Sequence, residues 1–339
     1  MSSSGKIKAA YKYLKNYYFS PKIEIKKFRE NMDNFFECKV LPNKVENNEF
    51  DCGGISCDLL TPELYDSHKA VLYVHGGSFV AGSRKSCRAF AAVLANAFNS
   101  KVYIPEFRLA PTYPFPSSID DIHAVFKYIY NEELISLSLE QDFDSTKDNI
   151  PKIIVVASDS GASIALGLLQ KLNERMLKSV QNVILFSPYL DISPSSTICS
   201  AKKMNDKLLT SETYRRSGEF YTFQDNSKSP LVSPLNIDSS VLKKFPPVYI
   251  QMGEEELLLT DAELFEKKMA DSGVKCVLDV WPKMMGMFQL ADDILDESHL
   301  AIEKIAKYLN GRKITSKDSQ KEIQIKLETV QDRNQEIKR

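Results

Sequence analysis

Short runs of apolar, β-branched residues alternate with longer stretches of helical periodicity along most of the chain. Six runs predict strands, at residues 70–75, 101–106, 152–157, 182–187, 248–252 and 275–281. Between them, apolar residues recur at helical spacing and predict helices over 86–98, 117–130, 162–177, 260–272 and 294–309. Most of the strands are almost entirely apolar, which is typical of strands covered on both faces. The pattern predicts an α/β fold with a mostly parallel central sheet flanked by helices.

Two segments interrupt this alternation. Residues 1–40 are aromatic-rich with helical spacing, and residues 191–245 form a polar stretch rich in serine and lysine between two predicted strands. A segment inserted after a strand can lie over the end of the sheet. We therefore expect one α/β domain over 41–310, with 1–40 and the insertion at about 191–245 forming a helical cap.

The carboxyl-terminal tail, residues 311–339, is highly charged. Ile323, Leu327 and Val330 share one helical face within it. The composition favours disorder, and a single loose helix is the alternative.

Composition and charge exclude some classes of function. The 339 residues are 43% hydrophobic and 26% charged, which is enough apolar material for a large core. With 44 basic and 45 acidic side chains the net charge is -1, so the whole chain has no field that would attract nucleic acid. We expect no nucleic-acid partner.

The cysteines and the amino-terminal residues bear on location. The six cysteines include no CxxC pair and no zinc-ligand spacing, which favours free, mostly buried thiols and an intracellular setting. Residues 1–19 hold lysines among tyrosines and no uninterrupted apolar run, so neither a signal peptide nor a transmembrane segment is expected. We predict a cytoplasmic protein.

The first chemical motif is His75-Gly76-Gly77-Ser78, directly after the strand at 70–75. Two glycines allow backbone N–H groups to approach a bound oxygen without obstruction by a Cβ atom. The tripeptide predicts an oxyanion-hole loop, although glycines after a strand also occur in ordinary turns.

The second motif lies between the strand at 152–157 and the helix at 162–177. A sharp strand-to-helix turn exposes a serine hydroxyl at this place in hydrolases, and Ser160 is the candidate nucleophile. Ser158 and Ala162 replace the flanking glycines of the usual pattern, and both are small. The alternative is an ordinary serine at a helix start.

Several motifs in unbroken order resemble the hormone-sensitive-lipase family of α/β-hydrolases over roughly residues 65–309. They are HGGSFVAGS at 75–83, FRLAPTYPFPSSIDD at 107–121, SDSGAS at 158–163, SPLVSPLN at 229–236 and PPVYIQMGEEELLLTDAELFEKKM at 246–269. The resemblance implies an esterase or lipase with a Ser-Asp-His triad under a helical cap. It also implies an acyl ester or apolar small molecule as ligand, with no metal or organic cofactor.

Transferred by position, the resemblance puts the oxyanion hole on the N–H groups of Gly76, Gly77 and Gly161 and the nucleophile at Ser160. The acid follows the glycine that ends a late strand, which here precedes three glutamates at 254–256. The family position of the acid falls on Glu256, although three adjacent glutamates leave the choice among them open.

The base is where the chain departs from the family. The family's histidine precedes an aromatic residue after the last strand, and here that position is Gly286. Of the four histidines His68, His75, His123 and His299, only His299 follows the acid, and it lies within the final helix, about thirteen residues beyond the expected place. A serine without a base is a poor nucleophile at neutral pH.

Two functions from different classes follow. The chain is either a carboxylic ester hydrolase with impaired or absent activity, or a non-catalytic relative that binds a small apolar ligand or a protein partner. The plant gibberellin receptors resemble this family and lack the histidine. Restoring a histidine at position 286 is expected to raise activity if the remaining site is intact. A third hypothesis is association with a membrane surface, and it rests on the aromatic face of the amino-terminal segment. The sequence does not indicate the oligomeric state.

Overall fold

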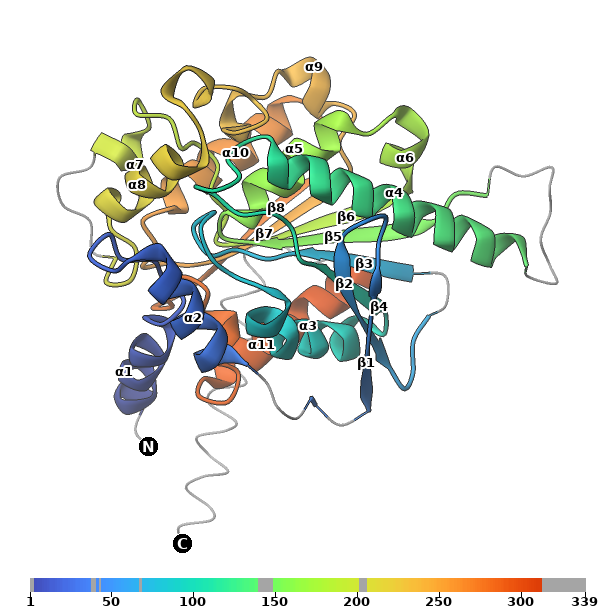
Figure 1. The fold of residues 1–339 in the computed structure, drawn as a ribbon, viewed down its shortest axis with the longest axis horizontal. Helices are drawn as coiled ribbons and strands as arrows, with labels where there is room; N and C mark the ends of the chain where they lie inside the picture. The colour runs from blue at the N-terminus through green and yellow to red at the C-terminus, as the bar shows by residue number, and fades with distance from the viewer. Residues whose placement is uncertain are drawn as a thin grey trace, which may run out of the picture.

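The structure is a computed structural model that describes residues 3–37, 41–42, 44–66, 69–139, 149–200 and 206–312. The predicted tail therefore lies outside the described residues from position 313 onward. The fold consists of one central sheet, helices on both of its faces, and a group of helices at one end (Figure 1).

The central sheet contains eight strands within the described residues, in the order β1-β2-β4-β3-β5-β6-β7-β8. All neighbours from β4 to β8 are parallel, whereas β1 pairs with β2, and β2 with β4, in antiparallel fashion. Their bounds are β1 (Val45–Asp51), β2 (Ser56–Pro62), β3 (Lys69–Val74), β4 (Lys101–Pro105), β5 (Lys152–Ser158), β6 (Val180–Phe186), β7 (Val248–Gly253) and β8 (Cys276–Trp281).

The predicted fold class is confirmed, and all six predicted strands are present within a few residues of their expected bounds. The hairpin of β1 and β2 was not predicted. Its first strand, VENNEFD, is polar and half-exposed, so it lacks the apolar run of a central strand. Gly53 and Gly54, both at positive φ, make the turn between the two strands.

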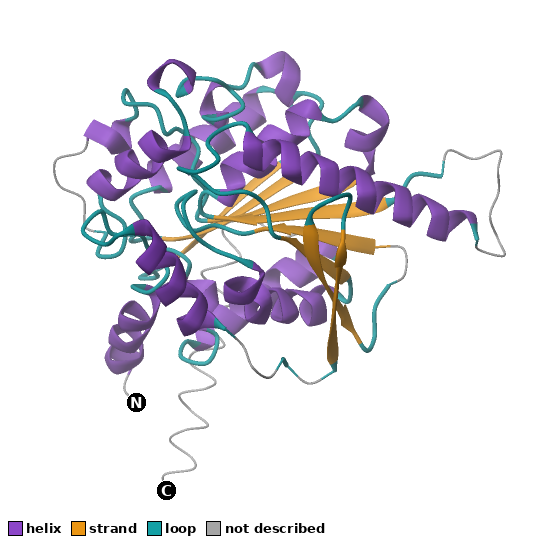
Figure 2. Ribbon diagram, in the orientation of Figure 1, coloured by secondary structure: helices purple, strands orange, loops and turns teal. Residues whose placement is uncertain are grey.

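Two layers of helices cover the sheet (Figures 1 and 2). Helices α3 (Arg84–Phe98) and α11 (Asp296–Leu309) lie on one face, and α4 (Ser117–Ser138), α5 (Gly161–Lys171) and α10 (Leu259–Asp271) on the other. The predicted helix over 162–177 is broken in two. Leu172 has an extended backbone, and Asn173 caps the short α6 (Glu174–Ser179) by accepting the N–H of Met176.

The remaining helices gather at the end of the sheet where the parallel strands terminate (Figure 1). They are α1 (Ser3–Leu14), α2 (Ile25–Phe36), α7 (Thr197–Ser200), α8 (Ser211–Tyr221), η1 (Gln224–Asn226), η2 (Pro234–Asn236) and η3 (Phe288–Ala291). The short α9 (Ser239–Leu242) lies apart from them, just before the start of β7. Phe19 packs against Phe220 with ring centroids 6.0 Å apart. The amino-terminal segment therefore contacts the segment inserted between β6 and β7.

The cysteines form no disulfide among the described residues. Cys52, Cys57, Cys87, Cys199 and Cys276 are free thiols, and Cys38 lies outside the described residues. In the part of the chain that the structure describes, no helix is long and apolar enough to cross a bilayer.

A buried ionic network fixes the last strand to the last helix. Asp279 of β8 accepts hydrogen bonds from Lys304 of α11 at 2.6 Å, Tyr249 at 2.7 Å, Trp281 at 2.9 Å and Gln251 at 3.0 Å. Burial alone would raise the pKa of Asp279, but the Lys304 ammonium and the neutral donors outweigh it and lower that pKa. The carboxylate stays ionised because its cation is buried beside it.

Substitution of Lys304 by methionine is expected to lower the free energy of unfolding by about 3–5 kcal/mol, because it leaves a buried carboxylate without its cation. Lys307→Met, one turn further on α11, removes a half-buried lysine whose ion pair with Glu303 is 4.0 Å long, and should change the free energy of unfolding by less than about 0.5 kcal/mol. Chemical denaturation of both variants checks this. Equal effects would show that the Asp279–Lys304 pair does not hold α11 in place.

Candidate functional site

The turn from β5 into α5 places Asp159 at its tip. Asp159 has a left-handed backbone with φ +50°, a conformation that non-glycine residues adopt rarely. Ser160 has φ -63° and already begins the helical turn. The tip of the turn therefore lies one residue earlier than the sequence prediction, which placed Ser160 there.

Gly161 explains this register. A Cβ atom at Gly161 would collide with the carbonyl oxygens of Val74 and His75, so the helix start approaches β3 closely only because the residue is glycine. In the hydrolase pattern the final glycine stands two positions after the nucleophile. Counting back two positions from Gly161 gives Asp159, and this count was the signal in the sequence that could have located the tip.

The Asp159 carboxylate occupies a cradle of backbone N–H groups. Its Oδ2 atom accepts hydrogen bonds from the N–H groups of Gly77 and Ser78, each at 2.8 Å. Burial raises the pKa of Asp159, and the N–H groups of Ser78, Gly77 and Ser160 partly offset that rise. The side chain is 1% exposed. The two N–H groups are therefore occupied by a carboxylate of the protein itself.

The three residues predicted to form the oxyanion hole are not equivalent. Only the N–H of Gly77 points to the Asp159 carboxylate, whereas that of Gly76 donates to Ser158 Oγ at 3.0 Å. Gly161 provides the close helix approach described above. Ser160 Oγ accepts the N–H of Phe79 at 2.8 Å and is buried.

Of the three adjacent glutamates, Glu256 is the one that enters the site. Its Oε1 atom accepts hydrogen bonds from the N–H of Gly253 at 2.5 Å and the hydroxyl of Ser187 at 3.0 Å. Glu254 accepts the N–H of Lys283 at the surface, and Glu255 accepts the hydroxyl of Tyr11. Burial is the main cause that raises the pKa of Glu256 to about 8.

Gly286 lies next to Glu256, at the position predicted for the missing base. A Cβ atom at Gly286 would lie 3.5 Å from Glu256 Oε2, so a side chain there would face the carboxyl group. It would also collide with the phenol oxygen of Tyr18, which comes from the connection between α1 and α2. The space beside Glu256 is therefore filled by a tyrosine from the amino-terminal segment.

Tyr17 fills the neighbouring space. Its hydroxyl donates to Ser158 Oγ at 3.4 Å, and a Cβ atom at Gly76 would collide with it. Tyr17 and Tyr18 are 5% and 6% exposed, and their ring centroids lie 5.4 Å apart. The aromatic residues of 1–40 predicted a cap segment, but that two of its tyrosines enter the site was not predicted.

The described histidines lie elsewhere. His299 is exposed on α11 between Asp292 and Glu303, at 3.6 and 3.3 Å, and His123 lies on α4. His75 is buried, with Nδ1 2.8 Å from Gly76 O and its ring stacked on Phe107. Burial lowers the pKa of His75. His68 lies outside the described residues.

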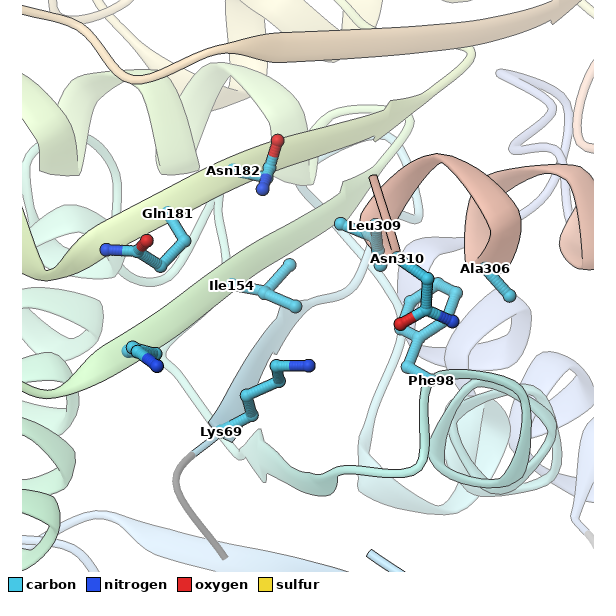
Figure 3. Close-up of a pocket in the computed structure, with 9 residues that line it drawn as sticks. Lys69, Phe98, Ile154, Gln181, Asn182, Ala306, Leu309 and Asn310 are labelled. Carbon is cyan, nitrogen blue, oxygen red and sulfur yellow. The ribbon is translucent and has the colours of Figure 1, made fainter. Parts of the chain in front are cut away.

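One cavity of the described structure lies away from this turn. A cavity of about 230 Å³ at the amino ends of the strands is lined by Lys69, Ile154, Asn182 and Asn310, among others (Figure 3). None of the predicted site residues borders it. Among the residues that the structure describes, no group of three histidine, cysteine or acidic side chains could hold a metal ion.

Comparison with known proteins agrees with the fold and the motifs. Residues 71–290 match the model of a family described as alpha/beta hydrolase fold. An acetyl-hydrolase of Streptomyces hygroscopicus is 28% identical over 258 residues, 76% of this chain and 80% of that protein. An esterase of Acinetobacter venetianus is 30% identical over 240 residues, 70% and 73% of the two chains.

A solved structure, an esterase of the bacterial hormone-sensitive lipase family, superposes with a TM-score of 0.77 at 22% identity. The alignment covers 91% of this chain and 98% of that one. The chain belongs to the α/β-hydrolase family and is esterase- and lipase-like, so the resemblance to the hormone-sensitive-lipase family is confirmed.

The buried Glu256 predicts a pH dependence of stability. Its pKa is about 8 in the folded chain and ordinarily 4.5, so between these pH values the folded protein holds a proton that the unfolded chain releases. This contribution to stability is complete below about pH 4.5 and is lost as the pH rises through about 8. Glu256→Gln should therefore gain stability relative to the wild type, by a few kcal/mol, between pH 5 and pH 9.

Urea denaturation of both proteins across this range measures the difference. Glu263→Gln, an exposed change on α10, should leave the wild-type pH dependence unaltered. If the free energies of unfolding of Glu256→Gln and the wild type differed by the same amount at every pH, Glu256 would be ionised in the folded protein throughout this range.

Proposed function

We propose that this chain is a catalytically silent esterase-like α/β-hydrolase whose acyl-transfer site is filled by its own side chains. One observation carries the proposal: Asp159 stands at the tip of the turn between β5 and α5, and its carboxylate accepts the N–H groups of Gly77 and Ser78. We assign these N–H groups, with that of Ser160, to the position of the oxyanion hole. In a working hydrolase such donors receive the oxygen of the tetrahedral intermediate. Here a buried carboxylate competes for the same place.

The surroundings of Ser160 support the inference that it does not act as a nucleophile. Its hydroxyl accepts a hydrogen bond from Phe79 N–H at 2.8 Å, and it lies within the helical turn rather than at the tip. A hydroxyl needs a neighbouring base before it attacks an ester. None of the described histidines forms a hydrogen bond with Ser160. The position that we propose for the base holds Gly286, which has no side chain to accept a proton.

Gly286 and Tyr18 support the loss of the base. Removing a triad histidine lowers turnover by on the order of 10⁶-fold. Tyr18 occupies the space that an imidazole at position 286 would need. We infer that Glu256 is what remains of the triad acid, kept by its bonds to Ser187 and Gly253.

The charges in the site also disfavour one alternative function, that of a receptor for a small apolar acid. The charge of Asp159 helps to raise the pKa of Glu256, and a bound anionic ligand would meet the same repulsion from Asp159. An apolar acid would therefore bind poorly here, so the proposal favours a role through other surfaces of the molecule. The cytoplasmic location stays a prediction.

The wild-type protein should not hydrolyse short-chain p-nitrophenyl esters above the rate of buffer, because nucleophile and base are both missing. Ser160→Ala should behave identically in the same absorbance assay. Turnover that is abolished by Ser160→Ala would contradict the proposal and favour an impaired but genuine hydrolase.

Activity should return only when three positions are changed together. Asp159→Ser supplies a nucleophile and frees the N–H groups, Gly286→His supplies a base, and Tyr18→Ala makes room for it. The triple variant should exceed the wild type at least about 100-fold, since each triad member acts as part of a unit. Gly286→His alone should stay inactive, in contrast to the expectation from sequence. Activity in that single variant would show that Ser160 is the nucleophile.

A further inference from the structure

The amino-terminal segment carries a strong local charge. Residues 1–30 contain eight lysines and arginines and two glutamates, a formal charge of +6 in a chain whose net charge is -1. Such asymmetry is typical of a surface that binds a polyanionic partner. The net charge of the whole chain does not reveal this local charge, because the remaining residues are acidic on balance.

Six of these lysines are exposed to solvent. Lys8, Lys12 and Lys15 follow one another at spacings of four and three residues, so they share one side of α1 and the turn that directly follows it. Lys22, Lys26 and Lys27 lie at the start of α2 and just before it; all six are exposed, and within the described residues none of them forms an ion pair. The structure therefore gives them no anionic partner.

The other two cations of the segment hold it to the body of the protein. Lys6 pairs with Asp296 at 2.8 Å, and Arg29 donates to the carbonyl oxygens of Val80 and Ala110 at 2.6 and 2.8 Å. The opposite face of α1 is buried through residues such as Leu14. The helices are thus fixed, and the six exposed lysines, named here the lysine face, point away from the core.

Two exposed apolar side chains lie on the amino-terminal segment and on the segment that it contacts. Ile23 follows Lys22 and is 38% exposed, and Phe223, just after α8, is 75% exposed. The contact of Phe19 with Phe220 brings the connection between α1 and α2 against α8. A protruding aromatic side chain near lysines is costly in water and favourable at a bilayer interface.

We propose that the lysine face, together with Ile23 and Phe223, docks this protein on a bilayer surface that contains anionic lipid. Clustered lysines attract acidic headgroups, and the two apolar side chains enter the boundary between headgroups and acyl chains. A nucleic acid or an acidic protein would use the lysines but leave Phe223 in water. The proposal is independent of whether the acyl-transfer site turns over.

Vesicle co-sedimentation of the full chain tests whether the lysine face binds anionic lipid through its charge. Phosphatidylcholine vesicles containing about one-quarter phosphatidylserine should pellet the protein at low salt, and phosphatidylcholine alone should not. Each lysine near the surface strengthens binding about fivefold, so Lys22→Glu, Lys26→Glu and Lys27→Glu combined should weaken it at least about 100-fold. Salt at high concentration should act in the same direction.

A matched control places the same charge change elsewhere. Lys178→Glu, Lys243→Glu and Lys244→Glu alter exposed lysines near the amino ends of β6 and β7, at the opposite end of the sheet. This variant should bind vesicles within about threefold of the wild type if position rather than net charge decides. Equal losses in the two triple variants would overturn the proposal, as would failure of the wild type to bind.

Phe223→Ser tests the lipid part separately. Phe223 is exposed, so its loss should leave the thermal unfolding temperature unchanged while weakening vesicle binding by about tenfold. Unchanged vesicle binding of this variant, with equally tight binding of the wild type to heparin, would overturn the lipid assignment in favour of a soluble polyanion.

Discussion

The hydrogen bonds from Gly77 and Ser78 to the Asp159 carboxylate are the constraint on which the rest of the site depends. They join the loop after β3 to the turn after β5, and the close approach of Gly161 to Val74 and His75 holds the same two segments together. A buried carboxylate without donors would be strongly unfavourable. The loop and the turn therefore stabilise one another around this buried carboxylate.

The amino-terminal segment completes this closed arrangement. Gly286 leaves a space beside Glu256, and the buried phenol of Tyr18 fills it, because protein interiors do not retain voids of that size. Tyr17 covers Gly76 and Ser158 in the same way. Asp159, Gly286 and Tyr18 are in this proposal mutually adapted, so that reversing one of them alone would not rebuild a site for acyl transfer.

Much of the fold follows from the sequence, because apolar central strands and amphipathic helices leave strong periodic patterns. The polar strand β1 left no such pattern, and a break at Leu172 depends on a local cap at Asn173. In the site, motif order alone led to Gly286 as the position of the missing base, which stays a prediction. The exact tip of the turn was missed because two small residues flank it, and Tyr18 was missed because a contact across more than two hundred residues has no local signal.

The central claim is that no activated serine stands in this site. A fluorophosphonate probe reacts with the activated serine of a hydrolase and adds a fixed mass, so intact-protein mass spectrometry of the wild-type chain measures the claim directly. The account predicts an unmodified protein after prolonged exposure. A stoichiometric adduct that peptide mapping assigns to Ser160 would contradict it.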